Sequence, residues 1–416
     1  MHLKTILNRV ERHKSFVYGK QHLVENGTEL RVEIAVRSRS NSRPICAGCG
    51  RTGPGYDRLP ERRFEYVPLW AIPVFLTYAL RRVNCAQCGV TVERVPWCDG
   101  KHAHCTTYRW FLARWAKRLS WDEVATVFRA SWDSVYRAVE YAVSWGLAHR
   151  KLEGIEAVGI DEVQWQRGHK YLTLVYQIDA GLRRLLWIGK DREEDSLRGF
   201  FREIPASVCE GLRYVCSDMW KPYLNVLSEC ARQAVHVLDR FHIMQRMNKA
   251  IDEVRADEAR RLKEDGKEIL KHSRWCLLKR PENLTERQAV KLSELLKCNL
   301  KAVRSYLMKE DFQRFWDYSS PSWAGKFLRE WCSRTMRSRI EPMKKVARML
   351  RSHQPLILNW FRAKKTISAG IVEALNNQVK LRTRKAHGFR TFDAIKIALY
   401  HQLGELPEPK FTHEFC

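Results

Sequence analysis

The stretch from Ala157 to Phe241 constrains the fold of this chain more than any other part of it. It contains apolar, β-rich runs separated by turn-forming or helical segments. The predicted order is three strands, then a helix, a strand, a helix, a strand and a helix. The predicted strands are residues 157–160, 170–178, 184–188, 213–217 and 234–238. The first three can form a meander, whereas strands that alternate with helices require parallel pairing through crossovers.

This order is that of a ribonuclease-H-like α/β fold, and we predict that fold for the core. In such a sheet the first and fourth strands are neighbours. Asp161 directly follows the first predicted strand, and Asp218 directly follows the fourth. The two carboxylates are therefore expected to lie side by side at one edge of the sheet.

A third carboxylate lies on a predicted helix over residues 371–384. A helical wheel with about 100° per residue places Ile371, Val372, Leu375 and Val379 on one face. The opposite face then holds Glu373, Asn376, Asn377, Lys380 and Arg384. A solvated, salt-bridged face is the alternative interpretation. However, Glu373 is the only acid in this helix, and between residues 362 and 396 bases outnumber acids nine to two. A lone acid in such surroundings is better explained as a metal ligand.

The net charge of +27 makes nucleic acid the leading partner, because a surplus of this size repels itself unless a polyanion neutralises it. A merely basic protein without an active site is the alternative. The chain has no apolar run of about 18 residues and its first residues lack a signal-peptide core, so no membrane association is expected. Most cysteines are scattered singly, which is typical of a reducing interior. We expect a cytoplasmic, nucleoid-associated protein.

Two Cys-x-x-Cys pairs indicate a structural zinc site in the N-terminal region. The pairs are Cys46 with Cys49 and Cys85 with Cys88, and a tetrahedral Zn²⁺ needs four such soft ligands. A redox pair or free thiols are the alternatives. A looser group nearby is expected not to bind metal: Cys98, His102, His104 and Cys105.

Three helices are predicted after the cysteine pairs, over residues 106–118, 121–128 and 132–145. Ser120 and Glu123 form a capping-box pattern before the second helix, and Ser131 can cap the third. A short helix, a tight turn and a longer helix are typical of a helix-turn-helix. The third helix would present these residues to a DNA groove: Trp132, Asp133, Ser134 and Arg137. Any small three-helix bundle shows the same pattern, so the DNA interpretation depends on the charge and on the adjacent zinc module.

Residues 264–365 are helical in pattern and rich in tryptophan, which predicts a helical domain inserted into the α/β core. The predicted domains are therefore a zinc ribbon (1–104), a helix-turn-helix (105–150), the first part of the core (151–262), the helical insertion (263–366), and the last core helix with the C-terminal tail (367–416).

The motifs in this order resemble those of the ISL3 family of insertion-sequence transposases. The matching segments are the two cysteine pairs and residues 159–162, 217–223, 239–242, 368–380 and 387–389. The resemblance implies a DDE transposase whose catalytic residues are Asp161, Asp218 and Glu373. It also implies zinc ligation by the four paired cysteines, a basic position at Lys380 and a helical insertion before the last acid.

The implied chemistry is cleavage and strand transfer at terminal inverted repeats, with double-stranded DNA as substrate and target. Two Mg²⁺ ions would be held by oxygen ligands, with Asp161 bridging both while Asp218 and Glu373 hold one each. Lys380 and Arg384 would hold phosphates, and a homodimer on DNA is expected. Two other classes remain: a non-catalytic, sequence-specific DNA-binding protein, and a stand-alone nuclease of the same fold.

Four further residues near the predicted site have weaker claims to function. Glu162 could be a spare ligand, but strand alternation points its side chain to the opposite face. Asp239 and His242 follow the fifth strand, where capping of the next helix is the commoner role for an aspartate. Trp220 could stack on an extruded base, although packing in a core is the simpler role.

Overall fold

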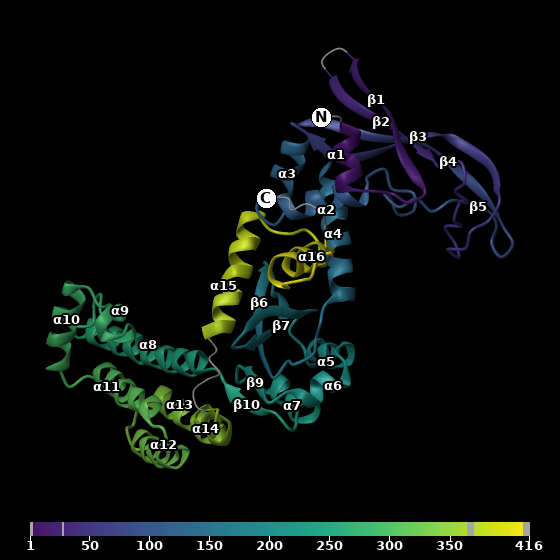
Figure 1. The fold of residues 1–416 in the computed structure, drawn as a ribbon. Helices are drawn as coiled ribbons and strands as arrows, with labels where there is room; N and C mark the ends of the chain where they lie inside the picture. The colour runs from purple at the N-terminus through teal and green to yellow at the C-terminus, as the bar shows by residue number, and fades with distance from the viewer. Residues whose placement is uncertain (1–2, 27–28, 364–369, 411–416) are drawn as a thin grey trace. The chain divides into compact units, whose positions relative to one another are not determined.

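The computed structural model describes residues 3–26, 29–363 and 370–410, which form two compact units (Figure 1). The first unit is drawn from residues 1–151 and 385–416, and the second from residues 152–384. The chain from Lys385 onward thus belongs with the N-terminal modules, whereas the sequence prediction grouped it with the core. The finer domain boundaries given above stay predictions.

The first unit contains a sheet with the strand order β1-β2-β4-β3, to which β5 adds by pairing with β4. Its core surrounds Trp97, which is fully buried, with ring centroids of Phe16 and Tyr78 at 4.9 and 5.4 Å. Helix α1 and strand β1 were not predicted from the sequence. The elements are α1 (Leu3–Val10), β1 (Phe16–Asn26), β2 (Glu29–Ser38), β3 (Gly55–Leu69), β4 (Ile72–Cys85) and β5 (Gly89–Val92).

Three helices follow where the sequence predicts them: α2 (Thr106–Trp115), α3 (Trp121–Phe128) and α4 (Trp132–His149). The predicted capping box is confirmed, because Ser120 and Glu123 each accept a hydrogen bond from the other's backbone N–H. Ser131 caps α4 by accepting from the N–H of Ser134. The turn between α3 and α4 begins at Arg129, whose backbone is left-handed with φ 53°.

A helix near the C-terminus, α16 (Phe392–Leu403), completes this bundle by packing against α4. The segment after it is held by two ion pairs, because Glu408 accepts from Arg114 at 2.8 Å and from Lys117 at 2.7 Å. These contacts join the end of the chain to the three-helix region.

The second unit is built on a sheet with the strand order β10-β9-β6-β7-β8. Its strands are β6 (Ala157–Gln166), β7 (Lys170–Asp179), β8 (Leu182–Lys190), β9 (Tyr214–Ser217) and β10 (Val235–Leu238). Strands β6, β7 and β8 pair antiparallel, whereas β9 pairs parallel with both β6 and β10. The predicted meander and the predicted neighbourhood of the first and fourth strands are therefore confirmed.

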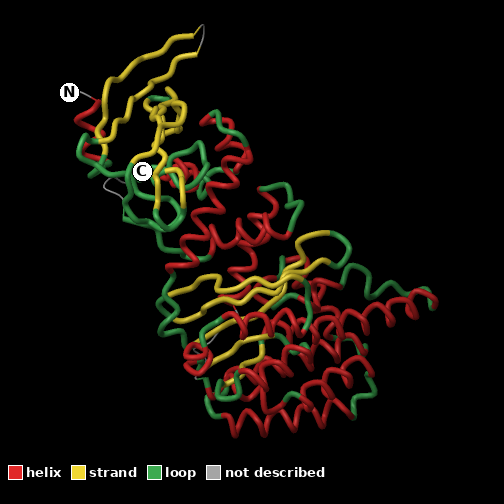
Figure 2. Tube along the Cα trace, turned by 90° about the vertical axis from the view of Figure 1, so that its right-hand side faces the viewer, coloured by secondary structure: helices red, strands yellow, loops and turns green. Residues whose placement is uncertain are grey.

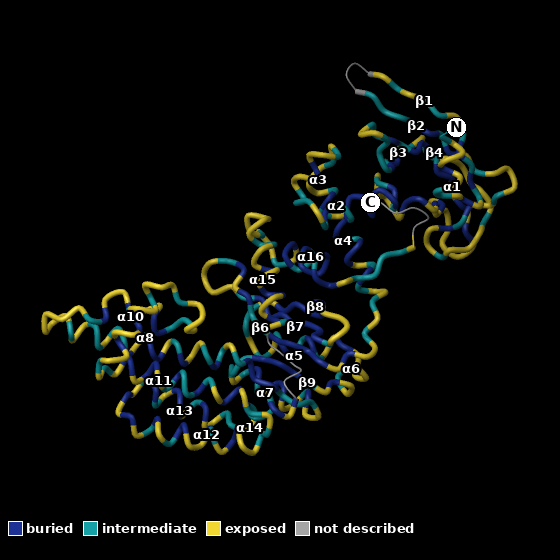
Figure 3. The backbone as a smooth tube through the Cα atoms, turned by 60° about the vertical axis from the view of Figure 1, so that its left-hand side comes forward, coloured by how far each residue is buried: buried dark blue, intermediate teal, exposed yellow. Residues whose placement is uncertain are grey.

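One side of this sheet packs against α5 (Glu194–Glu203), α6 (Ala206–Gly211) and α7 (Lys221–Cys230). Apolar residues from the strands and from these helices form one continuous core, in which Val158, Val175 and Phe200 are almost completely buried. The strands β6, β7 and β8 are correspondingly dark along much of their length in Figure 3. Burial on both sides explains why these strands are apolar runs rather than alternating ones.

Helix α15 (Gly370–Lys385) approaches β6 very closely at Gly159. A Cβ atom added to Gly159 would lie 2.4 Å from Cγ2 of Val372 and 3.3 Å from Cγ2 of Ile178. No real Cβ tolerates the first distance, so the missing side chain at Gly159 is what lets the helix lie against the strand.

A block of helices follows β10 and shares one apolar core, in which Phe312, Phe315 and Trp331 lie close together. Every regular element described between residues 240 and 362 is helical, as predicted for the insertion (Figure 2). The α-helices are α8 (Arg240–Glu264), α9 (Arg274–Leu278), α10 (Glu286–Leu296), α11 (Lys301–Gln313), α12 (Pro321–Met336), α13 (Glu341–Ser352) and α14 (Gln354–Arg362). Within the described parts of both units, no helix combines the length and apolarity needed to cross a membrane.

Substitution of Gly159 by alanine is expected to destabilise the second unit by about 1–3 kcal/mol, the usual cost of forcing an extra methyl into a packed core. The stiff, β-branched Val372 cannot swing away, so α15 must shift. Urea unfolding measures the loss. Gly181→Ala is the matched control, because a Cβ there meets nothing within 4 Å. If Val372→Ala fails to restore stability to Gly159→Ala, this account of the close approach is wrong.

Candidate active site and cysteine cluster

Three aspartates follow parallel strand pairings in the second unit. The pairing of β6 with β9 ends two residues before Asp161 and two residues before Asp218. The pairing of β9 with β10 ends one residue before Asp218 and one residue before Asp239. Because strands in a parallel pairing run in the same direction, the three aspartates come to the same edge of the sheet, the one at the carboxyl ends of β9 and β10.

Asp161 is held by a buried hydrogen-bond chain that reaches it from α15. Asn376 donates through Nδ2 to Oδ2 of Asp161 at 2.6 Å, and Tyr176 donates its hydroxyl to Oδ1 of Asn376 at 2.7 Å. Nε2 of His242 lies 4.0 Å from the other carboxylate oxygen. Burial raises the pKa of Asp161 above its ordinary value, although His242 and Lys380 act in the opposite direction. The backbone N–H of Glu162 donates to Oδ1 of Asp161 at 2.8 Å, so a hydrogen bond to each oxygen fixes the orientation of the carboxylate.

The helical-wheel placement of Asn376 on the outer face of α15 is wrong. Asn376 is only 4% exposed, and it lies on the same face as the buried Val372, Leu375 and Val379. The face that meets the sheet therefore includes an amide as well as apolar residues. A buried amide is tolerated here because Tyr176 and Asp161 satisfy its hydrogen bonds.

Glu373, Lys380 and Arg384 are exposed on α15, as the wheel predicts. The charge of Glu373 contributes to the raised pKa of Asp239, and the charge of Lys380 acts on Asp161. Among the described residues, however, the three predicted catalytic acids do not form a group whose ligand atoms all lie within 4.8 Å. Their joint role as metal ligands stays a prediction.

Asp218 contacts a base that the sequence analysis missed. Arg192, in the connection between β8 and α5, lies 3.2 Å from Asp218 and 2.5 Å from Glu162. Its guanidinium carbon lies 4.4 Å from the centroid of the Trp220 ring, and the backbone N–H of Trp220 donates to Asp218 at 2.9 Å. Trp220 therefore supports the arginine. The signal that could have revealed Arg192 is a base placed directly beyond the third strand of the sheet.

The Glu162 side chain belongs to this arginine cluster, while its backbone N–H donates to Oδ1 of Asp161 at 2.8 Å. Burial raises the pKa of Glu162 to about 8, and the neighbouring charge of Asp218 adds to the effect while Arg192 opposes it. The adjacent Asp161 meets Asn376 and His242 instead.

Asp239 caps α8, which confirms the commoner of the two roles considered for it. Its carboxylate accepts from the N–H of Phe241 at 2.7 Å, and Nε2 of His242 lies 3.6 Å from its other oxygen. Burial raises the pKa of Asp239 to about 6, although His242 opposes the shift. A direct catalytic part for either residue stays untested.

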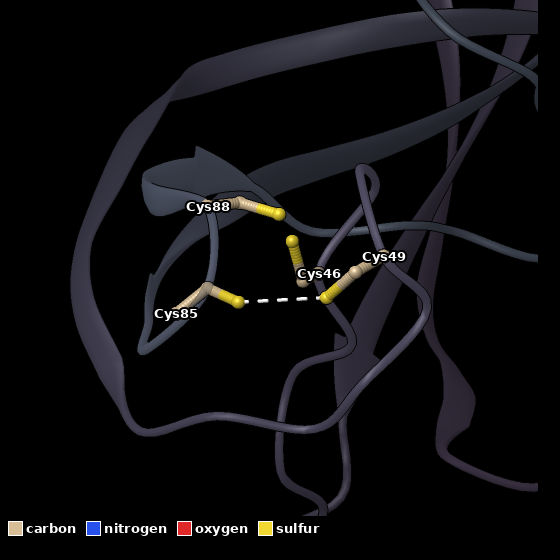
Figure 4. A group of neighbouring side chains, drawn as sticks. All are labelled: Cys46, Cys49, Cys85 and Cys88. Carbon is tan, nitrogen blue, oxygen red and sulfur yellow. Dashed lines mark hydrogen bonds between the residues drawn. The ribbon is translucent and has the colours of Figure 1, made fainter.

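The four paired cysteines of the first unit come together from two turns (Figure 4). Their sulfur atoms all lie within 4.8 Å of one another, with Sγ of Cys49 and Sγ of Cys85 at 3.5 Å. Hydrogen bonds from Thr91 and from nearby backbone N–H groups lower the pKa of Cys46 to about 6. Backbone hydrogen bonds also lower the pKa of Cys85. Four converging thiols, two of them with a lowered pKa, are a suitable donor set for a tetrahedral soft metal ion.

The looser group of cysteines and histidines forms no comparable cluster among the described residues. Cys98 donates to the carbonyl oxygen of His102 at 3.0 Å, and His104 lies 3.2 Å from Glu65. Cys105 is fully buried, and burial raises the pKa of its thiol well above the ordinary value. These residues have local structural partners.

The predicted DNA contacts on α4 are accessible to different degrees. Trp132 is 49% exposed and stacks on Tyr136 with ring centroids 5.6 Å apart. Arg137 is exposed and pairs with Asp133 at 2.9 Å. The Ser134 hydroxyl lies 2.8 Å from that of the capping serine before α4. Arg137 is thus the strongest candidate for a contact to DNA, because a surface ion pair is easily exchanged for a phosphate or a base.

Known proteins with similar sequences are transposases. Residues 158–399 match the ISL3 family model described as "Transposase". The transposase for insertion sequence element IS1001 of Bordetella parapertussis is 30% identical over 354 residues, which cover 83% of this chain and 85% of that relative. The transposase for insertion sequence element IS1557 of Mycobacterium tuberculosis is 29% identical over 414 residues, which cover 92% and 90%. Because the family model spans more than half of its residues, this chain belongs to the ISL3 family of insertion-sequence transposases.

Proposed function

We propose that this transposase cuts and joins DNA at the terminal inverted repeats of its insertion sequence by metal-dependent phosphoryl transfer. The proposed catalytic residues are Asp161, Asp218 and Glu373, within a core of the ribonuclease-H-like type. The observation that carries the proposal is the packing of α15 on β6 through Gly159 and Asn376. Glu373 lies between Val372 and Asn376 in the sequence of α15, and its charge acts on Asp239 at the end of β10.

The donor set fits a hard divalent cation, since all three proposed ligands are carboxylates. Asn376 donates to Oδ2 of Asp161 and the backbone N–H of Glu162 donates to Oδ1, and each oxygen keeps a second lone pair for a cation. When bound by these acids, two Mg²⁺ ions would activate the attacking oxygen and stabilise the leaving one.

The protein's own groups have separate tasks in this proposal. Asn376 orients Asp161, and Arg192 offsets the repulsion between Asp218 and Glu162. Lys380 and Arg384 are exposed on the outer face of α15, where they would hold DNA phosphates beside the acids. Phosphates held in this way keep the scissile bond in line with the attacking oxygen.

The first unit supplies DNA recognition in this proposal. Zn²⁺ held by Cys46, Cys49, Cys85 and Cys88 would stabilise the N-terminal module, because a structural zinc site contributes folding energy. Helices α3 and α4, joined by a short turn, would act as a helix-turn-helix with α4 in the major groove.

The carboxylates are tested by Asp161→Asn, Asp218→Asn and Glu373→Gln. Each substitution should reduce cleavage and strand transfer to background while terminal-repeat binding stays near that of the unsubstituted protein. The losses should not add in double variants, because the three acids act as one unit. A gel assay with a labelled terminal-repeat duplex and Mg²⁺ measures both steps. Glu264→Gln, at an exposed acid in α8, is the control. A Glu373→Gln protein that still cuts DNA would rule out this mechanism.

Zinc content tests the cysteine cluster. Purified protein should contain about one Zn²⁺ per chain, as a four-thiolate site requires. Cys85→Ser should lose the metal and destabilise the first unit, because metal-binding energy is folding energy there. Metal analysis and thermal unfolding provide the two measurements, with Cys298→Ser, a cysteine of the helical block, as the control. Full metal content in a Cys46→Ser/Cys85→Ser double variant would refute the site.

Arg137→Ala tests α4 as the reader of DNA sequence. A side chain that contacts base edges should contribute about 1–3 kcal/mol to discrimination between the terminal repeat and random DNA. The expected result is a larger loss of affinity for the repeat than for a random duplex, measured by fluorescence anisotropy. Lys101→Ala, at an exposed base outside the helices, should weaken both alike. Equal losses on both duplexes for Arg137→Ala would make α4 a scaffold.

A further inference from the structure

Positive charge is concentrated in one half of the helical block. Residues 321–362, which hold α12, α13 and α14, contain ten lysines and arginines against two acids. Residues 240–320, a segment nearly twice as long, contain nineteen lysines and arginines against thirteen acids. Helical folding does not require this asymmetry, since the two halves share one apolar core.

The bases of α12 lie along its outer face. Lys326 and Arg329 in α12 and Arg337, which directly follows the helix, are exposed, at spacings of three and eight residues that keep them on one side. One exposed acid, Glu330, lies on the same side. The opposite side carries buried residues such as Leu328 and Trp331, which pack in the block's core. Figure 3 shows the same alternation of exposed and buried positions along α12.

The basic face continues from α12 onto α13. Arg351, at the end of α13, donates to the hydroxyl of Ser333 on α12 at 3.3 Å. Next to this contact lies an open depression of about 550 Å³. Its lining includes four arginines and two acids, which are Arg314, Arg329, Arg334, Arg337, Asp311 and Glu330. We refer to Lys326, Arg329, Arg337 and Arg351 as the basic face.

The arginines in this region differ in whether they have an acidic partner. Arg334 lies 2.7 Å from Asp311, and Arg314 lies 3.8 Å from the same carboxylate. Arg329, Arg337 and Arg351, in contrast, have no carboxylate oxygen within 4.0 Å among the residues that the structure describes. Arg329 and Arg337 line the depression, and guanidinium groups without a carboxylate partner are suited to phosphate, which they can bind with two parallel hydrogen bonds.

We propose that the basic face is a second DNA-binding surface, which contacts the phosphate backbone without reading sequence. The proposal rests on DNA being the substrate in the proposed function, and it assigns a task to the helical block. From Lys326 to Arg337 the helix advances about 16 Å. This length spans about five phosphates of one DNA strand. A backbone contact of this kind would add affinity equally on the element's end and on unrelated DNA.

The test is the salt dependence of DNA binding by the full-length protein carrying Arg329→Ala, Arg337→Ala and Arg351→Ala. Each lost phosphate contact lowers the slope of log K against log salt by about 0.9 for duplex DNA, so the triple variant should lose up to about 2.7 from the slope. The loss should be the same for terminal-repeat and random duplexes. Binding is measured without added Mg²⁺ and without a chelator on a Glu373→Gln background, so that cleavage plays no part and any zinc in the first unit is kept.

Two further triple variants complete the design. Arg287→Ala, Lys297→Ala and Lys301→Ala remove three exposed bases from the other half of the block and should change the slope much less. Arginine-to-lysine changes at 329, 337 and 351 keep the charge and should keep most of the slope, which separates a charge effect from misfolding. An unchanged slope in the first variant, or an equal loss in the control, would overturn the proposal. A catalytically active Glu373→Gln protein would defeat the catalytic proposal and leave this result standing.

Discussion

The contact between α15 and β6 is the constraint on which the rest of the second unit depends. Gly159 has no side chain, so Val372 can occupy the space above the strand, and Asn376 then reaches Asp161 at 2.6 Å. The four residues from Val372 to Asn376 advance the helix by about 6 Å, close to the length of two strand residues, so both contacts form in the same register. Without the first contact the second would be out of reach, and Glu373 would have no fixed position relative to the strand.

The same edge of the sheet concentrates negative charge in a strongly basic protein. Asp161, Glu162 and Asp239 all have raised pKa values because burial disfavours their ionised forms. Two basic side chains lie among these acids. Arg192 pairs with Glu162 and Asp218 on one side, and His242 lies between Asp161 and Asp239 on the other. Such a cluster is costly to fold, which is typical of sites whose purpose is chemistry rather than stability.

Local patterns carried much of the fold prediction, because each corresponds to a local physical requirement. The strand order, the capping box at Ser120 and the gathering of the paired cysteines all followed from short segments and their spacing. The errors lie where tertiary contacts decide. In the sequence Asn376 has the pattern of a surface residue, because its hydrogen-bond partners Tyr176 and Asp161 lie far away in the chain. Similarly, nothing in the sequence of α16 indicates that this helix packs on α4. Arg192 is similar, since its partners lie up to 30 residues away in the chain.

The manner in which α15 is anchored has a consequence for how such elements can evolve. Gly159 and Asn376 set the position of α15 against β6, whereas the helical block is joined to β10, where Asn359 donates to the backbone carbonyl of His236 at 2.8 Å. A change within the block therefore acts first on β10, and a change at Gly159 acts first on α15. Loss of Gly159 would displace α15 even in a copy of the gene that keeps all three proposed acids.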